Sequence, residues 1–450
     1  MLKRIKVENF KSLKHLDYKC AKLNLLMGLN GAGKSSFVQL LRLMQGVSGS
    51  IGSPQTSVYP NMFGCGDSVD DMEYAYSDGS KPISFAVVFN GADNVTDFEL
   101  RRVIVNDERI WAMPGAVCVQ RPEWEEVYEQ SQLPIVNLHS ERSRGANVHD
   151  EEIAAAEKLA AETFASVENK WRMEDALSAR NFGQMWLGGR FVDAFRDKPR
   201  EVHAGGCYKT VAVLFGPNYI STFNPEGQNV MEYLYKVDGS RDLRLSDGSR
   251  GIREALDKCL QWVSPGAKLK IEEKLLGESE HYKHAYYVAS LDYGARGDQR
   301  CFKPQNVGFG VSYILPVLTT LLSANPGNIL IIENPEAHLH PRGQAEIGKL
   351  IAETVARGVQ VFVETHSDHV INGIRVAVKK CIVKPEDVNI AFFERSPHNV
   401  VADDGATRDE IYSEVRNIKV GADGSLSEYP TDFMDEWSIQ QLRLFSGRKV

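Results

Sequence analysis

The sequence predicts an α/β fold: a mixed sheet with an antiparallel subdomain and a mostly helical insertion. Three observations lead to this fold class. Residues 23–45 combine a short apolar run, a glycine-rich loop and apolar side chains at helical spacing. From residue 306 onward, a glycine-rich turn is followed by helix, strand, helix and strand patterns, which is typical of α/β folds. Between these parts, residues 145–265 are rich in Ala, Glu, Leu, Arg and Lys and are expected to be mostly helical.

Length and composition narrow the class of protein. A chain of 450 residues indicates one large domain with an insertion, or several domains. The net charge of −8 gives no general attraction to nucleic acid or anionic membrane, although a local basic groove stays open. No apolar run reaches the roughly 18 residues that a membrane span needs, and the N-terminus lacks the apolar core of a signal peptide. The seven cysteines are scattered, as in a reducing compartment, so we expect a cytoplasmic protein without membrane contact.

The N-terminal elements follow from periodicity. The first 45 residues are expected to form strand, turn, strand, loop and helix. RIKVENF (4–10) alternates polar and apolar residues, and LNLLM (23–27) is a short apolar run. Further along, ISFAVVF and FELRRVIV (within 83–105) predict antiparallel strands, and PIVNLH (134–139) predicts another strand.

GLNGAGKS, residues 28–35, matches the pattern G-x-x-x-x-G-K-[ST]. Glycines let the backbone curl around phosphate oxygens, and the following helix points its N-terminus at the same anion. We expect Lys34 to reach the β- and γ-phosphates of ATP and the Ser35 hydroxyl to bind Mg²⁺. An ordinary glycine-rich turn is the alternative, which the preceding strand and following helix disfavour. The expected nucleotide contacts are Asn30, Gly31, Ala32, Gly33, Lys34, Ser35 and Ser36.

The second half of the chain supplies acids and a histidine at predicted strand ends. NILII (328–332) has the continuous apolar character of a central parallel strand, and Glu333 follows it, placed to hold the water shell of Mg²⁺. A solvated acid at a strand end is the alternative. A helix is expected from Pro341 to just before Gly358. The next strand, VQVFVE, delivers His366 to its tip, where a histidine can sense the γ-phosphate or hold the attacking water.

NVGFGVSYILPVLTTLLSA, residues 306–324, predicts a glycine-punctuated loop that opens an apolar helix. Ser312 is expected to cap this helix, and Pro316 lies near enough to its start to be tolerated. Gly308 and Gly310 would leave backbone N–H groups exposed beside the helix N-terminus. The segment is therefore a candidate second anion-binding end.

The order of these motifs resembles ATP-binding-cassette-type ATPases of the SMC, Rad50 and RecF kind, and more narrowly compact bacterial AAA-type ATPases of that clan. The C-terminal stretch resembles a domain of unknown function found in that subgroup, and the middle of the chain shows no resemblance. The motifs that carry it are KRIKVENFKSLK, GLNGAGKSS, the loop with Arg142 after PIVNLH, NVGFGVSYILPVL, IIENPEAHLHP, VETHSDHVINGIR and NIKVGADGSLSEYPTDFMDEW.

The resemblance implies a P-loop NTPase head of the ABC/SMC type that binds ATP and Mg²⁺. Residues 1–144 would form the first part of the head, and residues 145–265 the helical insertion. Residues 266–400 would carry the signature segment, the Walker B strand and the switch histidine. Residues 401–450 would form a C-terminal extension of β-hairpin and helix.

The resemblance also implies roles for residues. Gly308, Gly310 and Ser312 match the signature that contacts the γ-phosphate of the opposite protomer in a head-to-tail dimer, and His366 matches the switch histidine. In the clan the strand-end acid is usually Asp, a Mg²⁺ ligand through water, and the next residue is a Glu that polarises the attacking water. Here those positions are Glu333 and Asn334.

An asparagine amide is a poor proton acceptor, so Asn334 can orient a water but cannot act as an effective general base. Two outcomes stay open: Glu336 activates the water together with His366, or hydrolysis is slow and the ATP-bound dimer is long-lived. We expect slow turnover, because Glu336 lies beyond Pro335 in a loop that can point toward the dimer partner.

The resemblance favours a regulatory ATPase that pairs with itself, as a dimer or higher oligomer, and controls a separate effector. Compact relatives act beside a nuclease or toxin in anti-phage systems of the Septu or PARIS type. A RecF-like repair ATPase that binds DNA directly is the alternative, and a nucleotide-dependent scaffold without hydrolysis is a third. Nucleic acid would be a partner if the protein is a RecF-like repair ATPase.

Overall fold

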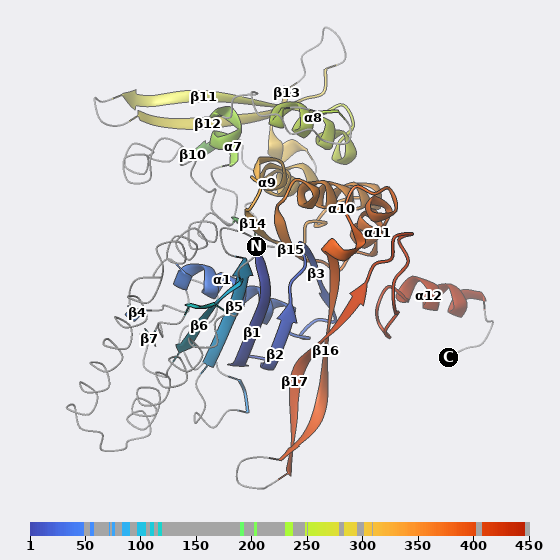
Figure 1. The fold of residues 1–450 in the computed structure, drawn as a ribbon. Coiled ribbons are helices and arrows are strands. Elements are labelled where there is room, and N and C mark those ends of the chain that lie inside the picture. Colours follow the sequence, from blue (N-terminus) through green and yellow to red (C-terminus); the bar gives the residue numbers. More distant parts are fainter. Residues whose placement is uncertain are drawn as a thin grey trace.

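The computed structural model describes residues 1–48, 55–57, 72, 74–76, 83–90, 97–104, 109–111, 116–118, 190–192, 202–204, 230–236, 248–249, 251–278, 283–294, 301–307, 309–401 and 407–445. Within these residues the strands form three sheets, and Figure 1 shows them along the length of the molecule. The predicted strand 134–139, the loop with Arg142 and Gly308 lie outside the described residues.

The central sheet has six strands in the order β17-β16-β3-β15-β14-β9. All neighbours are parallel except β16 and β17, which form an antiparallel hairpin. Parallel strands are buried on both faces, which explains the continuous apolar runs of β14 and β15. The strands are β3 (Leu23–Gly28), β9 (Arg190–Val192), β14 (Ile329–Glu333), β15 (Gln360–Glu364), β16 (Val388–Val401) and β17 (Thr407–Lys419).

The N-terminal sheet is antiparallel and has the order β2-β1-β5-β6-β7-β4, with β8 paired to β6. Its first strands alternate buried and exposed side chains, as expected for a sheet with one covered face. The strands are β1 (Leu2–Phe10), β2 (Leu13–Lys19), β4 (Gln55–Ser57), β5 (Ile83–Asn90), β6 (Asp97–Ile104), β7 (Arg109–Trp111) and β8 (Ala116–Cys118).

A third, antiparallel sheet lies at the opposite end of the molecule from the N-terminal sheet, beside two helices (Figure 1). Its order is β10-β12-β11, with β13 paired to β12. Its elements are β10 (Val202–Ala204), α7 (Val230–Lys236), α8 (Ile252–Val263), β11 (Lys268–Glu278), β12 (Lys283–Asp292) and β13 (Cys301–Phe302).

Helices cover both faces of the central sheet. Alternate side chains of β3, β14 and β15 pack into two separate cores, one shared with three helices of the C-terminal half and the other with α1 and the N-terminal sheet. None of the described helices is long and apolar enough to cross a membrane. The remaining helices are α1 (Lys34–Ser48), η3 (Pro304–Asn306), α9 (Phe309–Ser323), α10 (Pro341–Ala356), α11 (Asp368–Lys379), η4 (Pro385–Asp387) and α12 (Glu436–Phe445).

The predicted fold class is confirmed, and so are its best-patterned elements. The strand after residue 22, the helix after the glycine-rich loop and the antiparallel pair β5 and β6 all form. Helix α10 begins at Pro341 and ends before Gly358, as expected, and it buries Ile347, Leu350, Ile351 and Val355.

Other expectations need correction or stay open. The first 45 residues contain a third strand, β2, which pairs with β1. Helix α9 begins at Phe309, so Ser312 lies in its first turn and is not its N-cap. Within the range 145–265, the described residues include strands β9 and β10 as well as helices α7 and α8, and β9 is part of the central sheet. The helical character of the rest of that range stays a prediction.

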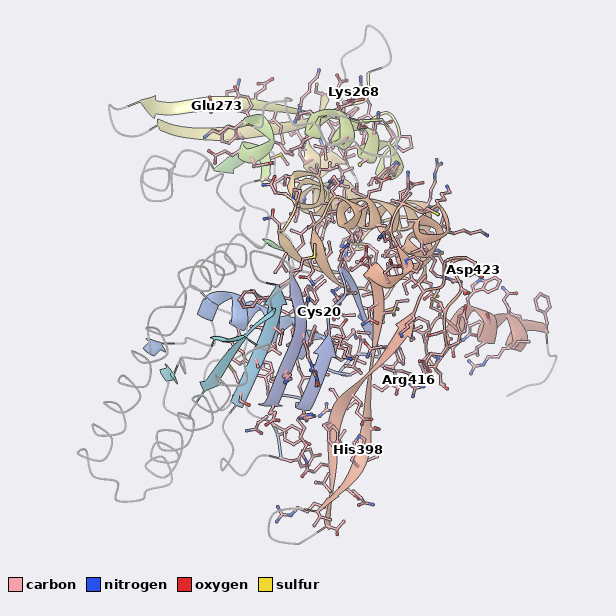
Figure 2. All side chains as sticks on the ribbon, viewed as in Figure 1. Cys20, Lys268, Glu273, His398, Arg416 and Asp423 are labelled. Carbon is pink, nitrogen blue, oxygen red and sulfur yellow. The ribbon has the colours of Figure 1, made fainter. Side chains whose placement is uncertain are left out.

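The predicted boundary at residue 400 falls inside the hairpin of β16 and β17. β16 leaves the central sheet after Phe393 and continues with β17 as a two-stranded arm, on which Figure 2 labels His398. Arg416 bonds across the strands to Glu394 at 3.1 Å, and the ring of His398 stacks on that of Tyr412 with centroids 4.0 Å apart. The C-terminal extension therefore continues directly from the central sheet.

The side chain of Phe37 links α1 to the central sheet. It is fully buried, and its ring contacts those of Tyr18, Phe362 and Phe393 with centroids 5.2 to 6.4 Å apart. We expect Phe37→Ala to lower the free energy of unfolding by about 3–5 kcal/mol, because it leaves a cavity between two sheets. Urea unfolding followed by circular dichroism measures the change. Loss of less than about 1 kcal/mol would contradict this packing.

Candidate nucleotide-binding site

Three parallel strand ends and one helix start meet at one edge of the central sheet. β15 lies between β3 and β14, so their carboxyl ends are neighbours. The register pairs Glu333 directly with Glu364, and the loop after β3 leads straight into α1. In open α/β sheets, ligands bind at the carboxyl ends of the strands. This edge is therefore the candidate site.

The loop from Gly28 to Lys34 has the backbone that its glycines predict. Gly28, Gly31 and Gly33 all have positive φ, with values of 133°, 77° and 108°. The Lys34 side chain is buried, and its Nζ donates to the carbonyl oxygens of Gly28 and Leu29, both at 2.8 Å. Burial lowers the pKa of Lys34, and the nearby charge of Glu364 opposes that shift. The ammonium group thus lies inside the loop that it is predicted to serve.

The other loop residues differ in their surroundings. Asn30 is exposed and Ala32 is buried, with the Ala32 N–H donating to the Leu29 carbonyl at 3.2 Å. The Ser36 hydroxyl lies 3.2 Å from that of Ser12, on the turn between β1 and β2. The structure therefore ties Ser36 to the N-terminal sheet, whereas Lys34 lies within the loop.

Gly33 is where the loop touches the C-terminal hairpin. A Cβ atom at Gly33 would lie 2.2 Å from the Ser413 hydroxyl and 2.8 Å from that of Ser12. We expect Gly33→Ala to distort the loop, since the new methyl meets a buried serine and the φ of 108° disfavours any side chain. ATP affinity measured by calorimetry should fall by about 10-fold or more, as for a loss of roughly 1.4 kcal/mol. Gly31→Ala is the control for positive φ alone, because a Cβ there has no atom within 4 Å. Equal affinity losses in the two variants would show that the Ser413 contact does not matter.

An acid that the sequence analysis did not single out lies beside the loop. The Ser35 hydroxyl donates to Oε1 of Glu364, at the end of β15, at 3.4 Å. Glu364 is buried, and burial raises the pKa of its carboxyl, against the lowering effect of Lys34 and Ser35. Glu364 ends an apolar strand just as Glu333 does. This shared position is the feature of the sequence that could have identified Glu364 as a site residue.

These residues fit a magnesium ion. Mg²⁺ in nucleotide sites is held by one or two protein oxygens together with phosphates and waters. Oε2 of Glu364 is buried and has no hydrogen-bond partner among the described residues, and the Ser35 hydroxyl is next to the same carboxylate. No group of three or more His, Cys, Asp or Glu side chains forms a metal cluster in the described part of the chain. The donor set suits a P-loop ion and does not suit a zinc site.

Glu336 and His366 come together across two loops. Oε1 of Glu336 accepts a hydrogen bond from the backbone N–H of His366 at 2.9 Å. Burial and the charge of Lys34 both lower the pKa of His366, which favours a neutral imidazole near pH 7. The charge of Glu336 also raises the pKa of Glu364. The carboxylate of Glu336 is thus held at the loop that carries His366.

Asn334 sits in the left-handed region, with φ of 44°, and its N–H donates to the Glu364 carbonyl at 2.8 Å. Asparagine tolerates this conformation better than most residues do. The residue at this position therefore has a conformational role in the turn after β14, whatever its role toward a water.

The signature-like segment packs against the same turn. A Cβ at Gly310 would lie 2.8 Å from the His338 carbonyl oxygen, and the rings of Tyr313 and His338 have centroids 4.5 Å apart. Ser312 is half-buried in the first turn of α9. Lys34, Ser35, Glu336 and His366 therefore meet Glu364 at the edge of the sheet. Gly310 and Ser312 belong to helix α9, which packs against the turn that carries Glu336.

Models of three known protein families match parts of the chain. A family model described as "AAA ATPase domain" matches residues 1–180, and one described as "AAA domain, putative AbiEii toxin, Type IV TA system" matches residues 159–372. A model described as "Protein of unknown function (DUF3696)" matches residues 383–444. An uncharacterized protein of Methanocaldococcus jannaschii is 23% identical over 265 residues, covering 52% of this chain and 32% of that protein. The match thus spans about a third of that relative.

Solved SMC heads are similar over nearly the whole chain. A head bound to the C-winged helix domain of ScpA has a TM-score of 0.45 at 13% identity, covering 93% of this chain and 97% of that one. The SMC head domain from Thermotoga maritima has a TM-score of 0.38 at 11% identity, covering 93% and 99%. Together with the loop geometry around Lys34, the two AAA matches, which run from residue 1 to residue 372, support an ATPase with an AAA-type nucleotide-binding domain.

Proposed function

We propose that the protein binds ATP with Mg²⁺ in the loop 28–35 and hydrolyses it, and that it uses this cycle to control a separate effector protein. The observation that carries the ATP proposal is the meeting of Lys34, Ser35, Glu336 and His366 at one sheet edge, although they come from distant parts of the chain. Polar groups from several elements converge here beside a helix N-terminus, as an anionic ligand requires.

Each residue has a distinct task in the proposed hydrolysis. The loop N–H groups and Lys34 bind the phosphates, and Ser35 holds the metal ion, which supplies charge stabilisation to the transferring phosphoryl group. Glu336 and the neutral imidazole of His366 orient the attacking water, and Glu336 accepts its proton. The buried side of the site, formed by Glu364 and Thr365, excludes bulk water.

The effector proposal is supported by two contacts that lead away from the site. Gly33 touches Ser413 on the hairpin, whose backbone N–H donates to the Ser12 carbonyl at 2.8 Å. Helix α11, which follows the His366 loop, bonds through Arg375 to the Gly424 carbonyl at 2.7 Å. Changes at the nucleotide can therefore reach the C-terminal extension, where an effector would be controlled. The class of effector, a nuclease or toxin in anti-phage defence, rests on the family resemblance.

The test of the ATPase is steady-state phosphate release by the purified protein with Mg·ATP, with and without duplex DNA. Turnover that depends on Mg²⁺ and is indifferent to DNA supports a regulatory ATPase. Strong stimulation by naked DNA would favour the RecF-like alternative. Absence of both ATP binding and turnover would overturn the proposal.

We also propose that ATP is bound between two protomers arranged head to tail, with Ser312 of one facing the nucleotide of the other. Ser312→Arg is then expected to block pairing, because a bulky cation replaces a hydroxyl at the dimer contact, while monomer binding of ATP persists. Sedimentation velocity with a slowly hydrolysed ATP analogue measures pairing, and Ser312→Ala is the matched control. Normal pairing of a folded Ser312→Arg protein would count against this arrangement.

A further inference from the structure

The carboxylate nearest to the Ser35 hydroxyl is that of Glu364, on the strand between the loop strand β3 and the strand that carries Glu333. Glu364 pairs in register with Leu26 of β3, whereas Glu333 pairs with Glu364 and is one strand further from the loop. Neighbouring strands lie about 4.8 Å apart, so the backbone of Glu333 is about that much further from the loop than the backbone of Glu364. The strand order therefore favours Glu364 over Glu333 as the acid nearest to Ser35.

The surroundings of Glu364 are those of an ion-binding acid. One oxygen lies 3.4 Å from the Ser35 hydroxyl, while the other is buried with no hydrogen-bond partner among the described residues. A buried carboxylate oxygen without a partner is costly unless a proton or a cation compensates it. Lys34 lies near, but its Nζ donates to the Gly28 and Leu29 carbonyls. A cation at Ser35 would satisfy the free oxygen.

We propose that Glu364, together with Ser35, holds the Mg²⁺ of the nucleotide site, directly or through one bound water. The assignment rests on the proposed ATP function and adds to it the acid that fixes the metal. Glu333 then has a supporting place at the end of β14.

The experiment compares Glu364→Gln with Glu333→Gln in the full-length protein. Mn²⁺ binding is measured by electron paramagnetic resonance in the presence of a non-hydrolysable ATP analogue, and nucleotide affinity is measured separately with EDTA. We expect Glu364→Gln to weaken Mn²⁺ binding about 10-fold or more, as losses around a metal site do, and Glu333→Gln to weaken it less. Affinity for metal-free nucleotide should be unchanged or higher, because a negative charge near the phosphates is removed.

Glu353→Gln is the matched control, since Glu353 is a comparably buried glutamate that pairs with Lys349 on α10, at 3.5 Å. Double substitution with Ser35→Ala provides a second measurement: if Ser35 and Glu364 hold the same ion, their effects on Mn²⁺ affinity are less than additive. Should Glu364→Gln fail to fold, Glu364→Asp keeps the charge and is expected to bind Mn²⁺ more weakly than wild type.

The outcomes separate this inference from the function on which it rests. Wild-type protein that binds neither ATP nor Mn²⁺ with the analogue overturns the proposed function. Wild-type binding together with unchanged Mn²⁺ affinity in folded Glu364→Gln overturns the role of Glu364 alone. Loss of metal-free nucleotide binding in Glu364→Gln, with Mn²⁺ affinity preserved, would show that Glu364 acts only as a partner of Lys34.

Discussion

Replacing Lys34 with alanine is expected to abolish productive ATP binding while the protein stays folded. The Lys34 ammonium is the buried positive charge inside the loop, and in the structure it donates to two carbonyl oxygens of that loop. Hydrogen bonds between charged partners contribute roughly 1.5–3 kcal/mol each, so losing two such bonds to phosphate weakens binding about 100-fold or more. Burial lowers the pKa of Lys34, but Glu364 opposes this shift and phosphate oxygens would oppose it further.

Isothermal titration of ATP against the folded variant measures the loss, with thermal unfolding as the check on folding. Lys22→Ala is the matched control, because Lys22 precedes β3, at the end of that strand opposite the loop, and pairs with Asp387 at 3.0 Å. Unchanged ATP affinity in a folded Lys34→Ala protein would remove the basis of the proposed function.

The parts of the site that could be predicted from sequence are those built from consecutive residues. The loop 28–35 needs its glycines at fixed positions, and the strand before it and the helix after it each have a clear period. The same holds for β14 and α10, whose proline and glycine mark the start and end of the helix. Local sequence determines local backbone in these segments.

The parts that could not be predicted depend on contacts between distant residues. The bond from Ser35 to Glu364 joins positions 329 apart in the chain, and only the strand order places them together. In VETHS the sequence pattern points to His366, whereas Glu364, two residues earlier, is the residue bonded to the loop. β2 was not expected because only Leu13, Leu16 and Tyr18 are buried in this short strand, and the residues between them are charged or polar.

The start of α9 also differs from the expectation, because the expected N-cap, Ser312, lies inside the helix. Ser312 is a good N-cap residue by type, but the helix begins at Phe309. A Cβ at Gly310 would lie 2.8 Å from the His338 carbonyl oxygen, so only a glycine allows this approach to the turn after β14. The local sequence does not show this contact between distant residues.

The second large effect is expected on kcat, when the group that activates the attacking water is replaced. We expect Glu336→Gln to lower kcat by about 10²–10⁴-fold with ATP affinity nearly unchanged, because the variant keeps the shape but loses the proton acceptor. We propose Glu336 as the base, against the expectation of slow turnover, because its carboxylate accepts the His366 N–H at 2.9 Å at the loop that carries His366. Single-turnover and steady-state phosphate release measure the effect, with Glu346→Gln on α10 as a control of like charge.

Asn334 provides the opposing test. If hydrolysis is slow because position 334 lacks an acid, an acid placed there should accelerate it. The φ of 44° at this position disfavours glutamate, however. Asn334→Glu places a longer side chain in the left-handed region at a cost of about 1–2 kcal/mol, so its failure alone decides nothing. Asn334→Asp introduces a carboxylate that tolerates this backbone. If Glu336→Gln is inactive and Asn334→Asp is no faster than wild type, Glu336 is the base. If Asn334→Asp is at least about 10-fold faster, a gain of roughly 1.4 kcal/mol in the barrier, and Glu336→Gln retains wild-type turnover, the native protein is a slow switch whose asparagine prolongs the ATP-bound state.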